Sequence, residues 1–117
     1  MHEELYGCLL LSLQVPCIII TWNGFANSTQ FRWLMNRGLE LYIVEAARTQ
    51  TLGWLADTRN VSAVKEMDQV WLKTDWNLRA SAAGIHHVSF VIPKSVFGQI
   101  MVRNYSTNAT QYDIIPT

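Results

Sequence analysis

The sequence predicts a single α/β domain with a mixed sheet of four to five strands, and three observations lead to this prediction. The chain has 117 residues, and single domains commonly span about 100–150 residues. Half of its residues are hydrophobic and 15% are charged, as in globular proteins. Two adjacent apolar segments open the chain, and helical and strand-like patterns then alternate.

An antiparallel hairpin is predicted at the N-terminus, with strands at 4–13 and 16–23. The second segment contains the β-branched run "IIIT", and Pro16 lies near the turn, where proline is tolerated. The combined apolar run is long enough to suggest a membrane helix. Pro16 in its middle, the polar Ser12 and Gln14, and the flank "HEE" argue against both a membrane segment and a secretory signal peptide. We therefore expect a soluble, cytoplasmic protein.

A first helix is predicted from Asn27 or Ser28 to about Arg48, because apolar residues recur there at helical spacing. Either residue at the start can cap the helix by accepting a backbone N–H. Gly38 falls in mid-helix, where glycine costs about 1 kcal/mol relative to alanine. Close packing against a neighbouring element is therefore expected at Gly38.

The remaining elements follow as strands and helices in alternation. The segment at 51–57, "TLGWLAD", is a predicted strand whose near-continuous hydrophobicity is typical of a strand covered on both faces. A helix at about 65–83, a strand at 86–93, a helix at 95–105 and an edge strand within 110–117 come next. Short strand–helix–strand connections imply parallel pairing. The inner stripe of the second helix is predicted to comprise Met67, Val70, Trp71, Thr74 and Leu78.

Three segments, "FANSTQFRWLMNRGLEL", "WLADTRNV" and "DQVWLKTDWNLRASAAGIHHVSFVIPKSVFG", resemble the STAS-like proteins related to the bacterial anti-sigma-factor antagonists. The chain is most similar to the small stand-alone bacterial branch with a STAS/SEC14-type fold. The resemblance runs from about Trp22 to Gly98. It implies an α/β sandwich, commonly non-enzymatic, that serves protein interaction or apolar ligand binding.

The chain departs from this family in two respects. The signalling antagonists carry a phosphorylatable serine at the start of the helix after the central strand, where this chain has Lys65 and Glu66, with Ser62 three residues before Lys65. The phosphorylation site is therefore not transferred. The family also usually ends with a further strand and helix, so residues 1–117 are expected to form one STAS-like domain without that last part.

The polar run "DTRN" at 57–60 follows the predicted central strand. Ligands of open α/β sheets bind beyond the carboxyl ends of parallel strands, so Arg59, Lys94 and the helix start at Ser95 are candidates for an anion site. The alternative is a structural turn in which Asp57 and Asn60 accept backbone N–H groups and Arg59 pairs with an aspartate. The candidate ligand-binding residues are Asp57, Arg59, Asn60, Lys94, Ser95, Trp54 and Trp71.

The second helix carries a candidate interface. Leu72, Trp76 and Arg79 fall at i, i+4 and i+7, away from the predicted inner stripe, and this composition is favoured in protein interfaces. These residues predict a homodimer or contact with another regulatory protein. The alternative function is an apolar-ligand module in which Trp54, Trp71 and Trp76 line a cavity and Arg59 or Lys94 holds a polar head group.

No catalytic residue, metal site or cofactor is predicted. The chain has no GxSxG, HExxH or CxxC motif, and His86 and His87 begin a strand, so their side chains face opposite sides of the sheet. Nine basic residues balance nine acidic ones and are dispersed, so nucleic-acid binding is not expected. Cys8 and Cys17 are interpreted as reduced thiols, with a cross-strand disulfide as the alternative.

Overall fold

The structure is a computed structural model that describes residues 2–4, 6–49, 51–61, 64–91, 99, 100, 102, 103, 105, 115 and 116. Its strands are β1 (His2–Glu4), β2 (Gly7–Ser12), β3 (Cys17–Gly24), β4 (Gly53–Val61), β5 (His87–Val91) and β6 (Ile115–Pro116). Its helices are α1 (Ser28–Ala46), α2 (Glu66–Trp71), the π-helical turn η1 (Leu72–Trp76) and α3 (Asn77–Ala82). The prediction of an α/β fold with a mixed sheet is confirmed.

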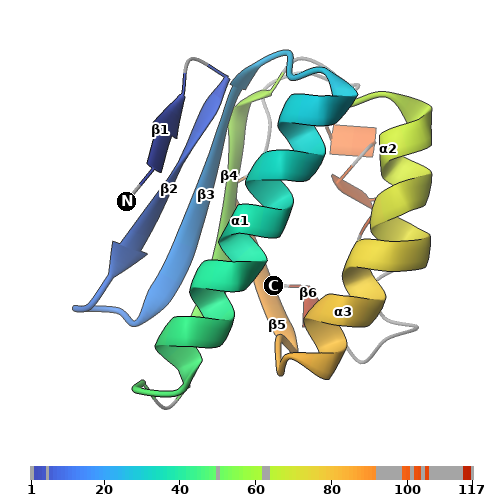
Figure 1. Cartoon of the computed structure of the whole chain (residues 1–117). Helices are drawn as coiled ribbons and strands as arrows, with labels where there is room; N and C mark the ends of the chain where they lie inside the picture. Colours follow the sequence, from blue (N-terminus) through green and yellow to red (C-terminus); the bar gives the residue numbers. More distant parts are fainter. Residues whose placement is uncertain are drawn as a thin grey trace.

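The strands form one sheet in the order β1-β2-β3-β4-β5-β6. β1, β2 and β3 pair antiparallel, as the predicted hairpin requires, and β3 to β6 are parallel. Each connection from β3 onward steps in the same direction across the sheet, and right-handed crossovers that step one way place their helices on one face. Figure 1 shows α1 and the segment α2-η1-α3 on the same side of the sheet.

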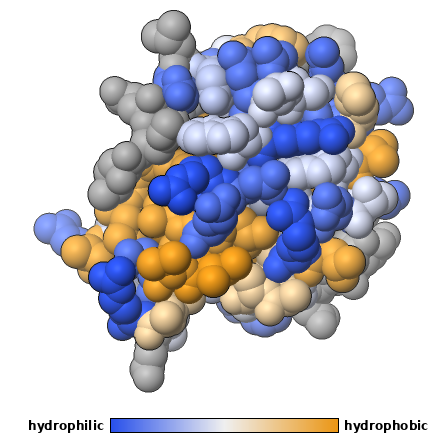
Figure 2. All heavy atoms as spheres, in the orientation of Figure 1, coloured by the Kyte–Doolittle hydropathy of each residue, from blue (hydrophilic) through white to orange (hydrophobic). Residues whose placement is uncertain are grey.

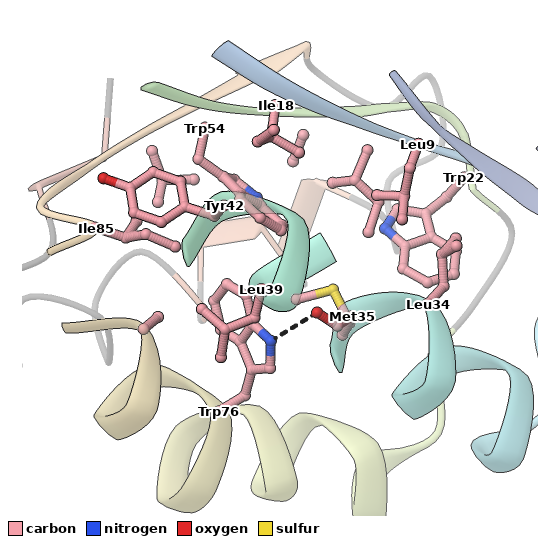
Figure 3. Packing of buried hydrophobic residues seen from close by; sticks show 14 of the residues in the cluster. Leu9, Ile18, Trp22, Leu34, Met35, Leu39, Tyr42, Trp54, Trp76 and Ile85 are labelled. Atoms are coloured by element: carbon pink, nitrogen blue, oxygen red, sulfur yellow. Dashed lines mark hydrogen bonds between the residues drawn. The ribbon is translucent and has the colours of Figure 1, made fainter. Parts of the chain in front are cut away.

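We call this side the covered face and the opposite side the open face. The core fills the space between the covered face and the helices, where Ile18, Leu34 and Trp54 are almost completely buried (Figure 3). No described helix packs on the open face (Figure 1). The expectation that the central strand is covered on both faces is therefore wrong for the described residues, because the strand order never reverses.

Helix α1 begins and packs as the sequence predicts. Asn27 is the N-cap: its Oδ1 accepts from the Gln30 backbone N–H at 2.8 Å, and the Gln30 side chain accepts from the Asn27 N–H at 2.9 Å. Gly38 lies against the sheet, where an added Cβ would come within 2.7 Å of the Trp54 ring. The predicted close packing at Gly38 is thus confirmed.

The second helical segment turns a different side inward from the one predicted. Met67, Val70 and Leu78 are more than half exposed, whereas Asp68 and Trp76 are fully buried. Met67, Val70 and Asp68 lie in α2, before η1 begins, and Asp68 faces inward because Ser28 and Arg32 of α1 bind its carboxylate. η1 follows as a turn with i→i+5 hydrogen bonding, wider than the α-helix with its 3.6 residues per turn. The residues on the inner side, spaced by four, are Asp68, Leu72, Trp76 and Ala80.

Among the described residues, no helix combines the length and the apolar character that a membrane crossing requires. Hydrophilic side chains occupy much of the surface over the helices, with hydrophobic patches around them (Figure 2).

Candidate functional site

The polar run "DTRN" lies within a strand. β4 continues to Val61, because β3 offers backbone partners beyond Thr21: Asn23 pairs with Asn60 and Gly24 with Val61 after a local irregularity. The expectation of a turn at 57–60 is therefore wrong. The pleat of the strand sends successive side chains to opposite faces, so the four polar residues do not form one cluster.

Thr58 belongs to the covered face and Asp57 and Arg59 to the open face. Thr58 is buried, and its hydroxyl donates to the Val91 carbonyl at 2.7 Å. Arg59 donates to Asp57 through two bonds, Nε to Oδ1 at 3.0 Å and Nη2 to Oδ2 at 2.8 Å. Hydrogen bonding from Arg59 is the main reason why the pKa of Asp57 lies below its ordinary value. This pair matches the structural alternative for Arg59.

The strand order bears on the predicted anion site as well. Ligand crevices of open α/β sheets form where the strand order reverses, and the order observed here runs β1 to β6 without reversal. The guanidinium of Arg59 is already engaged by Asp57. Lys94 and Ser95 lie outside the described residues, so their part of the anion-site prediction stays a prediction.

Trp76 is fully buried, and the expectation that it forms an exposed patch with Leu72 and Arg79 is wrong. Its Nε1–H donates to the Met35 carbonyl at 3.0 Å (Figure 3), and its ring lies 5.2 Å from that of Trp54. Leu72 packs against the core, while Arg79 is on the surface and donates to Asp75 and Asn36. Leu72 and Trp76 therefore lie on the inner side and Arg79 on the surface, so the three residues do not form one exposed patch.

Trp71 joins the two helical segments at the surface. The guanidinium carbons of Arg32 and Arg79 lie 5.3 Å and 5.8 Å from the centroid of its ring, within cation–π range. Arg32 also donates to the buried Asp68 at 3.0 Å, and the Ser28 hydroxyl donates to the same carboxylate at 2.9 Å. Sequence reasoning missed Asp68. Its position four residues before Leu72 and eight before Trp76 is the signal that marks it as an inner residue.

An apolar pocket of about 70 Å³ lies between the covered face, the helices and the residues Val102 and Tyr105. Trp54 and Trp76 line it as predicted, but Trp71 does not. Burial raises the pKa of the Tyr105 phenol above its ordinary value. The lining residues are Ile20, Trp22, Phe31, Met35, Trp54, Ala56, Thr58, Val61, Val64, Leu72, Trp76, Val88, Phe90, Val102 and Tyr105.

The open face presents rows of mostly small and apolar side chains across four strands, with Asp57 among them. The backbone register places Leu10, Ile19, Leu55 and Ser89 in one row and Cys8, Thr21, Asp57 and Val91 in the next. These side chains are partly exposed, and Leu10 is the most exposed of them. This face was not predicted from the sequence, because a continuous apolar run in a strand does not show whether helices cover one face of the sheet or both.

Both cysteines also belong to the open face and are free thiols. Cys8 pairs with Thr21 and Cys17 with Ser12, so the two lie four strand positions apart. At about 3.4 Å per residue, their Cα atoms are about 14 Å apart, well beyond the ~7 Å limit for a disulfide. The cross-strand disulfide is excluded in this fold, and burial raises the pKa of the Cys17 thiol.

Among the described residues, no group of three or more histidine, cysteine or acidic side chains is arranged to hold a metal ion. His86 and His87 are exposed at the start of β5. Comparison with protein-family models, characterised proteins and solved structures gave no match.

Proposed function

We propose that this protein is a non-enzymatic, STAS-like interaction domain of the cytoplasm that forms a homodimer through its open sheet face. The observation that carries the proposal is the strand order, which places the described helices on one side of the sheet. The open face keeps partly exposed apolar side chains such as Leu10, Ile19 and Leu55. An apolar surface of this kind on a small domain favours association.

A second copy of the chain suits this face on electrostatic grounds. The chain carries no net charge, so two copies do not repel one another over long range. The aspartate on the face, Asp57, is already paired with Arg59, which spares a dimer the cost of burying an unpaired carboxylate. Two such sheets can pack face to face at about 10 Å, with their strands roughly aligned.

The size of the face predicts how strong the association is. Four strands about 4.8 Å apart and about six residues long span roughly 19 by 20 Å, or about 400 Å² in projection. A standard interface buries about 800 Å² on each partner. The open face therefore supports a reversible dimer whose population depends on concentration, rather than an obligate one.

Leucine-to-lysine substitutions on the two sides of the molecule test this proposal. Leu10 on the open face and Leu78 on α3 are 46% and 57% exposed, so lysine at either position leaves the core intact. We expect wild type and Leu78→Lys to sediment as a concentration-dependent monomer–dimer mixture and Leu10→Lys to sediment as a monomer. Circular dichroism establishes that both variants fold. A monomeric wild type, or a Leu10→Lys variant that dimerises as wild type does, would show the proposal to be wrong.

A further inference from the structure

The pocket under the helices offers few polar partners to a water molecule. Its walls are mostly aromatic and aliphatic, and two of the polar hydrogens near it are committed elsewhere. The Thr58 hydroxyl donates to the Val91 carbonyl, and the Trp76 indole donates to the Met35 carbonyl. A buried water needs two to four polar partners, and apolar cavities without them stay dry.

The pocket is also built so that it does not collapse. Paired rings brace its walls: Trp22 stacks on Phe31 at 4.9 Å, Trp54 lies 5.2 Å from Trp76, and Phe90 meets Tyr105 edge-on at 5.6 Å. The residue between Trp54 and Thr58 on this face is Ala56, the smallest side chain of the lining. Large rigid rings around a small floor residue leave a void that side-chain relaxation alone does not fill.

The volume of the pocket sets the size of its occupant. One water needs about 10–15 Å³ of such space, and a dry cavity of about 150 Å³ binds benzene or xenon. At about 70 Å³, the pocket is several times larger than a water site and about half the size of the benzene cavity. Three or four carbon atoms are roughly what it holds.

We propose that this pocket is a binding site for a small, uncharged, apolar molecule, held by aromatic and aliphatic walls. The site lies on the covered face and is separate from the surface through which the chain is proposed to dimerise.

Xenon is the probe, because it is apolar, compact and enters dry cavities. Methyl NMR spectra of the whole chain are recorded under increasing xenon pressure. We expect saturable shifts of the lining methyl groups of Ile20, Met35 and Val88, while those of Leu10 and Ile19 on the open face stay unchanged.

Two filling variants and one control separate pocket binding from general contact with the surface. Ala56→Val and Val88→Ile add methyl or methylene groups to the lining and should abolish or weaken the saturable shifts. Thr21→Val places a β-branched residue on the open face and should leave the shifts as in wild type. Dispersed spectra show that each variant is folded.

The proposal fails if xenon causes no saturable shift in wild type. It also fails if the shifts persist at full size in both folded filling variants, because the gas would then bind elsewhere. Loss of the shifts in both filling variants, with retention in Thr21→Val, supports the site.

Discussion

Filling the pocket should stabilise the protein, and the size of the effect follows from the structure. A closed void of about 70 Å³ costs about 1.7 kcal/mol at about 24 cal/mol per Å³, so this partly open pocket costs at most about that much. Ala56→Val adds two carbon atoms at the floor of the cavity, and burial of each is worth about 0.8 kcal/mol, or about 1.6 kcal/mol together. Valine also suits a strand such as β4. We therefore expect the free energy of unfolding to rise by about 1.5 kcal/mol.

Urea unfolding, followed by tryptophan fluorescence and by circular dichroism, measures this change. A higher urea midpoint, with an unchanged slope of the unfolding free energy against urea concentration, identifies a change in stability rather than in the surface exposed on unfolding. Leu55→Val is the matched control, because it also introduces valine into β4, at the preceding residue, whose side chain faces the open side instead of the pocket. Destabilisation of Ala56→Val by about 1–3 kcal/mol would indicate overpacking, and the reasoning from the cavity would then be wrong.

Three further predictions test other parts of the structure. Asn77 is fully buried, and within the described part of the chain neither polar atom of its side chain has a hydrogen-bond partner. Asn77→Leu should therefore raise the free energy of unfolding by about 1–3 kcal/mol; a lower urea midpoint would mean that a hydrogen-bond partner satisfies the amide. Gly38→Ala gains about 1 kcal/mol of helix propensity but places a Cβ 2.7 Å from the Trp54 ring, so thermal unfolding should show net destabilisation; a higher midpoint would contradict the packing. Hydrogen bonding from Arg59 lowers the pKa of Asp57, so this pair stabilises the fold above the ordinary carboxyl value of 3.8 and less as pH falls through the folded pKa. As the pH is lowered, the urea midpoint of Asp57→Asn should therefore fall less than that of wild type. An equal fall with pH in both proteins would count against a stabilising role of the pair.

The parts of the fold that the sequence predicted depend on local signals. The hairpin followed from two apolar runs with Pro16 near the turn, and α1 followed from helical spacing after Asn27, which is its N-cap. Close packing at Gly38 followed from the cost of glycine inside a helix. Each of these signals lies within a few residues of the feature that it predicts.

The parts that the sequence did not predict depend on distant partners. β4 runs on to Val61 because Asn23 and Gly24 of β3 pair with its last residues, and polar composition alone suggested a turn. The inner side of the second helical segment includes Asp68 ahead of the π-helical turn and Trp76 within it, so a stripe chosen from other apolar residues placed Trp76 outside. Buried polar residues such as Asp68 are inward because Ser28 and Arg32 of α1 satisfy them.

The sheet separates the proposed dimer surface on its open face from the proposed binding pocket on its covered face, and successive residues of β4 belong to different sides. Leu55 faces the open side in a row with Ile19, whereas the next residue, Ala56, lines the pocket. A step of one residue along a strand changes the face, so a register slip in β4 would expose the pocket lining and bury the ion pair of Asp57. The Thr58 hydroxyl opposes such a slip, because its bond to the Val91 carbonyl ties β4 to β5 from the covered side. Thr58, which lies within the polar run but was not itself a candidate ligand residue, thus helps to fix which residues face the pocket and which face a partner.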